Sequence, residues 1–106
     1  MTLTDAIRDA STGHEIYFLL TSYVEAARYG DQLGRLPGEM RDHSITGMDD
    51  LSARIGKLKT VFGASPEELA EKDRVVVKEA LDVFCCALTR LRYLAEAERE
   101  MLAQAA

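Results

Sequence analysis

Apolar residues recur at steps of three and four positions through most of this 106-residue chain. Steps of this size place apolar side chains on one face of an α-helix, whereas a half-buried strand shows alternation with a period of two. The pattern predicts an all-α fold: a small three- to four-helix bundle with a long C-terminal helix, which we expect dimerisation to complete. We predict one helical domain over residues 1–106, with helices at about 4–11, 14–33, 48–62 and 66–104.

Residues that favour helix ends support these boundaries. Thr12 and Glu15 have the spacing of a capping box, in which the threonine accepts from a backbone N–H and the glutamate reaches back. Gly63 is suited to end the third helix. Ser65 and Pro66 then provide an N-cap and a first helical residue, followed by acids that favour a helix N-terminus.

The last predicted helix is too long for a small single domain to cover. A continuous helix over 66–104 would span on the order of 55–60 Å, about twice the length of the second helix. Either it breaks near residues 72–73, where Asp73 could cap a new helix, or its overhang packs on a partner chain. Both outcomes are compatible with the pattern.

Two of the predicted helices also carry apolar residues on the side away from their core-facing stripe. At about 100° per residue, Val75, Cys86 and Tyr93 fall opposite the stripe of the last helix, which extends to Met101 and Leu102. Such a helix is either central to a bundle or covered by another subunit. We therefore predict a homodimer, with these interface candidates: Phe18, Tyr29, Val75, Cys86 and Tyr93.

Charge and composition narrow the class of protein. A net charge of −5 and a pI near 5.0 argue against a nucleic-acid partner, because such binders usually carry a basic surface. The longest apolar runs are only a few residues, so we expect no membrane partner. The N-terminal residues lack the basic region of a signal peptide, and two neighbouring cysteines suit a reducing compartment. A cytoplasmic location is therefore predicted.

Cys85 and Cys86 invite a redox or metal interpretation. Neighbouring side chains on a helix point about 100° apart, and a disulfide between adjacent residues needs a distorted peptide that a helix does not allow. A metal site would need further ligands at helical spacing, and none accompanies the pair. We predict packing roles for both thiols, on different faces, although Cys85 lies near Arg74 and Arg92 on the helix surface.

The two histidines do not suggest a metal centre. His14 is expected at a helix N-terminus, a poor place for a cation, and His43 lies in the polar connection over about 35–46. The Glu-x-x-His spacing of di-metal bundles is absent. No cofactor is therefore predicted, and the connection stays the least explained segment.

One pair of short motifs resembles a known enzyme family. The stretches EELAE at 67–71 and EALD at 79–82 look like the EExxE and ExxD motifs of the all-α nucleotide pyrophosphohydrolases of the MazG and dUTPase-like kind. That resemblance implies Mg²⁺ held at nucleotide phosphates by acidic residues: Glu67, Glu68, Glu71, Glu79 and Asp82. In this chain the two motifs fall on one predicted helix, with Glu71 and Glu79 about 12 Å apart along it.

These observations favour association over catalysis. We expect a small helical protein that acts by self-association and then by binding another protein, as an adaptor or regulatory module. The alternative is the Mg²⁺-dependent pyrophosphohydrolase-like enzyme. A third possibility is a small-ligand pocket between helices, lined by Tyr17, Tyr23 and Phe84.

Overall fold

The computed structural model describes residues 2–29, 45, 47–63, 65, 67 and 71–105, and every regular element within them is a helix. In chain order these helices are α1 (Leu3–Asp9), α2 (Gly13–Tyr29), α3 (Met48–Phe62) and α4 (Glu71–Ala105). No strand occurs in the described residues, so the all-α prediction is confirmed and a helical bundle is consistent with the structure.

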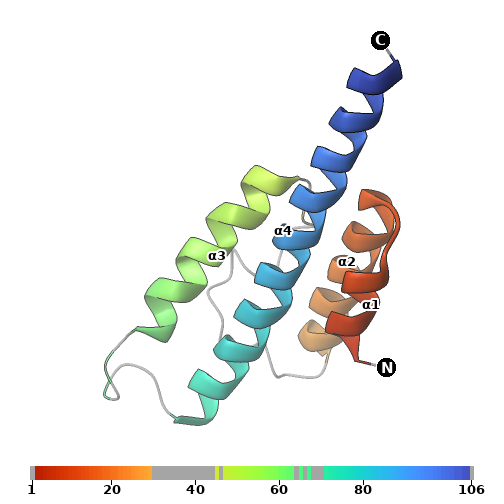
Figure 1. The fold of residues 1–106 in the computed structure, drawn as a ribbon. Helices are drawn as coiled ribbons and strands as arrows, with labels where there is room; N and C mark the ends of the chain where they lie inside the picture. Colours follow the sequence, from red (N-terminus) through yellow and green to blue (C-terminus); the bar gives the residue numbers. More distant parts are fainter. Residues whose placement is uncertain are drawn as a thin grey trace.

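Helix α4 is the centre of the arrangement, because it contacts each of the other three helices. Figure 1 shows α3 along one side of α4 and the pair α1–α2 along the other. The helices within each pair, α1 with α2 and α3 with α4, run in opposite directions (Figure 1). The molecule measures 56 × 24 × 24 Å, and its length follows that of α4.

The N-terminal helix begins earlier than the sequence pattern indicated. Thr2 Oγ1 accepts a hydrogen bond from the backbone N–H of Asp5 at 3.2 Å, and the Asp5 carboxylate accepts from the Thr2 N–H at 3.1 Å. This capping box starts α1 at Leu3. The hydrogen bonds from Thr2, backbone first and hydroxyl second, hold the pKa of Asp5 below its usual value, with a smaller contribution from Arg8.

The capping residues predicted for the second helix are in place. Thr12 Oγ1 accepts from the backbone N–H of Glu15 at 3.2 Å, as expected. The Glu15 carboxylate reaches back one residue further than the standard pattern and accepts from the N–H of Ser11 at 3.3 Å. The helix is described to Tyr29, and the predicted continuation over 30–33 lies outside the described residues.

The third helix has the predicted bounds, and the fourth is described from Glu71. Glu67 lies in a turn, so the predicted start at 66 is too early. From Glu71 the helix continues for 35 residues without the break considered near 72–73. The helix is about 52 Å long.

The core lies along α4, where side chains of all four helices meet. Phe84 is its largest fully buried side chain, and its ring meets Tyr23 edge to face with centroids 6.3 Å apart. Aromatic pairs in this geometry contribute about 0.5–1.5 kcal/mol beyond the area that they bury. The other fully buried large side chains come from α1, α2 and α3: Ile7, Ile16, Leu20, Leu51 and Leu58.

Tyr23 carries the largest pKa shift that is resolved in the described residues. Burial, and to a smaller extent the negative charge of Glu79, raise its pKa from 10.0 to about 12. The folded protein therefore keeps a phenolic proton that the unfolded chain releases at lower pH.

We expect the free energy of unfolding to fall as the pH rises from about 10 to 12, through the window between the unfolded and folded pKa values of Tyr23. Below pH 10 the phenol is protonated in both states and its titration contributes nothing. An ultraviolet titration of tyrosine should show one late step near pH 12 that is missing from Tyr23→Phe. Tyr93→Phe, which changes an exposed ring, should retain that step. A late step that survives Tyr23→Phe would contradict the assignment.

Candidate functional site

The C-terminal end of α4 projects beyond the rest of the bundle. Helix α2 begins at Gly13, where an added Cβ would lie only 3.4 Å from the Leu91 side chain. Helix α3 begins at Met48, which lines the same groove as Leu91. Beyond this level no other described helix lies beside α4 (Figure 1), and every side chain over residues 98–104 is exposed. We call residues 98–104 the projecting end of α4.

The apolar stripe of α4 continues from the core into this projecting end. Leu91 is buried, Leu94 and Ala95 are half-buried, and Met101 and Leu102 are 70% and 65% exposed. Steps of three and four residues put these positions on one helix face. The same stripe is therefore covered by the chain's own helices at one end and reaches solvent at the other.

An open groove lies at the base of the projecting end. It has a volume of about 460 Å³, and its walls come from α4, from the first turns of α2 and from the start of α3. Tyr17 in this groove is half-buried, and this burial raises the pKa of its phenol. We call this groove the α4 step. Its principal lining residues are Tyr17, Met48, Leu91, Leu94, Ala97 and Met101.

The interface residues predicted from sequence do not form one patch. Phe18, Val75 and Tyr93 are 67%, 62% and 59% exposed. However, Val75 and Tyr93 are about 27 Å apart along α4. Tyr29 ends α2, and its side chain lies outside the described part of the chain.

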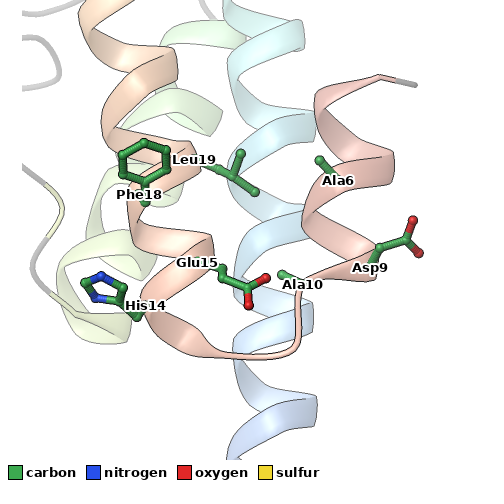
Figure 2. Close-up of a pocket in the computed structure, with 7 residues that line it drawn as sticks. All are labelled: Ala6, Asp9, Ala10, His14, Glu15, Phe18 and Leu19. Atoms are coloured by element: carbon green, nitrogen blue, oxygen red, sulfur yellow. The ribbon is translucent and has the colours of Figure 1, made fainter.

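Phe18 lines a separate groove of about 500 Å³ between α1 and α2, drawn in Figure 2. In Figure 2 the Glu15 side chain points toward Ala10, whereas Phe18 and His14 lie on the side of α2 away from α1. The Glu15 carboxylate is already engaged by the N–H of Ser11. One of the two carboxylates that line this groove is therefore occupied, and the exposed Phe18 and His14 side chains lie at its outer edge.

The two cysteines pack against the hydrophobic core, as predicted, but they also share one groove. Both are half-buried free thiols, and both line the groove between α1 and α4. The Cys86 thiol donates to the backbone carbonyl of Thr4, with a sulfur–oxygen distance of 3.8 Å. The two side chains point about 100° apart on α4, and α1 packs against α4 between these two directions. Both residues can therefore border one groove.

The acids of the enzyme-like motifs are spread along exposed surface. Glu67, Glu71, Glu79 and Asp82 are all exposed, and the last three belong to the single helix α4. Glu68 lies outside the described residues, as does His43. In the part of the chain that the structure describes, no three histidine, cysteine or acidic side chains are grouped for a metal ion. The hydrolase alternative stays a prediction.

The pocket expected between Tyr17, Tyr23 and Phe84 is not formed by these three residues together. Tyr23 and Phe84 pack against each other in the core. Tyr17 instead borders the α4 step at the other end of α2.

The residues that sequence reasoning missed are Met48, Met101 and Leu102. Their spacing placed them in core-facing stripes, yet all three are exposed and two of them line the α4 step. Periodicity identifies the apolar face of a helix but not the level at which the neighbouring helices begin. The usable signal was the difference between the predicted helix lengths.

Comparison with known proteins adds no assignment, because no protein family, curated protein or solved structure matches the chain. Among the described helices, none combines the length and the apolar character needed to cross a bilayer. The candidate surface therefore rests on the geometry of this molecule alone.

One polar contact fixes α1 beside α4. Arg90 donates from Nε and Nη2 to the backbone carbonyl of Ala10, at 3.0 and 2.8 Å, just beyond the C-terminal end of α1. The same guanidinium lies 4.8 Å from the centroid of the Tyr93 ring, within cation–π range. A cation at a helix C-terminus also interacts favourably with the helix dipole.

We expect Arg90→Ala to lower the free energy of unfolding by about 1.5–3 kcal/mol, since it removes charged donors from a partly buried carbonyl. Amide hydrogen exchange should rise most in α1. The matched control is Arg92→Ala, which removes an exposed arginine two positions away and should change stability by no more than about 0.5 kcal/mol. Equal effects of the two substitutions, or unchanged exchange in α1, would show that the contact does not hold this helix in place.

Proposed function

We propose that this protein acts by self-association, with the projecting end of α4 from one copy lying along the α4 step of a second copy. The observation that carries this proposal is the exposure of Met101 and Leu102 as a direct continuation of the core stripe. An apolar stripe that leaves its own bundle needs another apolar surface to be removed from water.

The shape of the chain supports a two-fold symmetric pair. The projecting end and the α4 step belong to the same molecule and are adjacent in it. In a two-fold arrangement each copy offers both surfaces, so every contact is made twice and the assembly closes at two copies. The two α4 helices would run antiparallel, because each projecting end points away from its own bundle and toward that of the partner.

The charge sequence along α4 agrees with an antiparallel arrangement. Arg90 and Arg92 lie at the start of the part of α4 that lines the step. Glu96, Glu98 and Glu100, with Arg99 among them, lie toward its far end, and Glu98 itself lines the step. In an antiparallel pair the acidic turns of one copy approach the basic turns of the other. Complementary charge of this kind sets the relative orientation of partners and offsets the repulsion expected between two chains of net charge −5.

Binding of a different protein is the second part of the proposal. The exposed Phe18 and Tyr93 side chains lie outside the α4 step, on the grooves that flank α1. They would stay accessible in the pair described above. An adaptor or regulatory role would use these two aromatic residues.

We expect Leu102→Glu to dissociate the pair. The substitution places a carboxylate in the apolar contact twice per dimer, and a loss of roughly 3 kcal/mol would raise the dissociation constant more than 100-fold. Light scattering coupled to gel filtration over a concentration series gives the mass directly. The matched control is Ala103→Glu, which adds the same charge in the same turn, about 100° around the helix from Leu102 and away from the apolar stripe.

Ala103→Glu should keep the mass of the unchanged protein, and circular dichroism should show equal helix content in both variants. A protein that is monomeric at every concentration, or a dimer that withstands Leu102→Glu, would overturn the proposal.

A further inference from the structure

The groove between α1 and α4 combines thiols with basic side chains. It has a volume of about 740 Å³, and its lining also includes the hydroxyl groups of Thr4 and Thr89. The described residues elsewhere contain no cysteine, so both thiols of the chain border this one groove. The groups that could recognise a ligand here are Arg8, Asp82, Cys85, Cys86, Arg90 and Tyr93.

The two thiols differ in their hydrogen bonding. The Cys86 thiol is directed at the Thr4 carbonyl of α1. In Cys85 the backbone carbonyl, not the thiol, is hydrogen-bonded: it accepts from the Thr89 hydroxyl at 3.0 Å. The side chain of Cys85 is half-buried and borders the groove. Of the pair, Cys85 is therefore the better placed to react with a molecule in the groove.

The charge of the groove favours an acidic reactant. Arg90 is held by the Ala10 carbonyl and the Tyr93 ring, so its positive charge has a fixed position in the groove lining, one helical turn from Cys86. Arg8 adds a second positive charge from α1, partly compensated by Asp5 at 3.7 Å. Asp82 supplies one negative charge to the lining. Arg8, Arg90 and Asp82 thus give the groove lining a net charge of +1, in a chain whose net charge is −5.

From these observations we propose that Cys85 is a site of mixed-disulfide formation with small acidic thiols, whose carboxylates lie beside Arg8 and Arg90. The reactant is a small acidic disulfide. The Cys85 thiolate attacks one sulfur, a new sulfur–sulfur bond forms, and the original one breaks. The other half of the reactant leaves as a thiolate and takes up the proton that Cys85 released. No further oxidant is needed, because the disulfide is reduced as the protein thiol is oxidised.

The neighbouring thiol cannot remove this adduct by an internal exchange. Resolution by Cys86 would join adjacent residues in a disulfide, which requires Cβ atoms within about 4.5 Å and a distorted peptide. Both cysteines lie within the unbroken helix α4, so such a bond would require local unwinding. The mixed disulfide should therefore persist until an external thiol reduces it. This inference is independent of the proposed self-association.

The test uses the full chain with two probes of opposite charge: glutathione disulfide, which is acidic, and cystamine, which is cationic. Adduct formation is followed by intact mass and located by peptide mapping. Each rate is divided by the rate for the same chain unfolded in guanidinium chloride, which removes the intrinsic difference between the probes. The folded protein should then favour glutathione disulfide by roughly three- to ten-fold, with the adduct on Cys85.

Substitutions separate the groove from general surface reactivity. Cys85→Ser should abolish the adduct, whereas Cys86→Ser should retain it. Arg8→Gln should reduce the preference for the acidic probe, and Arg99→Gln, an exposed arginine on the projecting end of α4, should leave it unchanged. An adduct chiefly on Cys86, a preference for cystamine, or a preference indifferent to Arg8→Gln would overturn the proposal, as would the absence of any adduct.

Discussion

The rest of this structure depends on the burial of one long helix. Helix α4 has 35 residues, whereas α1, α2 and α3 have 7, 17 and 15. The shorter helices pack along α4 with their apolar faces, and their combined reach ends at about the level of Gly13 and Met48. Because the stripe of α4 does not end there, the chain exposes apolar surface that its own described helices do not cover. Self-association, as proposed, would cover this apolar surface.

The placement of α1 has consequences of a different kind. This helix is only 7 residues long, too short to be stable alone, and its position depends on contacts with α4. Thr2 and Asp5 satisfy its N-terminus, and Arg90 satisfies the carbonyl beyond its C-terminus. By lying beside α4 it converts one side of that helix into the wall of a groove, so the two thiols, Tyr93 and Arg90 face a shared space.

The sequence was sufficient for the fold class and for several helix ends, because these depend on local signals. The bounds of α3 follow from its periodicity and from Gly47 and Gly63 at its ends, and Thr12 caps α2 as its spacing indicates.

The interface was harder to predict. Angular position on α4 correctly separated Val75 and Tyr93 from the core face, but it gave no information about which turns a neighbouring helix covers. Leu91 and Leu102 share one face and differ in exposure only because α2 and α3 begin between them. The joint placement of Cys85 and Cys86 depends likewise on where α1 packs, which is a tertiary property.

The projecting end of α4 is helical without the contacts that hold the other helices, and this is a consequence of continuity. Starting an isolated helix is costly, whereas adding a residue to an existing one is close to neutral. The packed part of α4 supplies the nucleus, and residues 98–104 extend it as added turns. A molecule that meets this end therefore encounters a helix already formed and does not have to order a disordered tail as it binds. The bundle thus keeps the projecting end of α4 helical before association, so less conformational entropy is lost when this end binds.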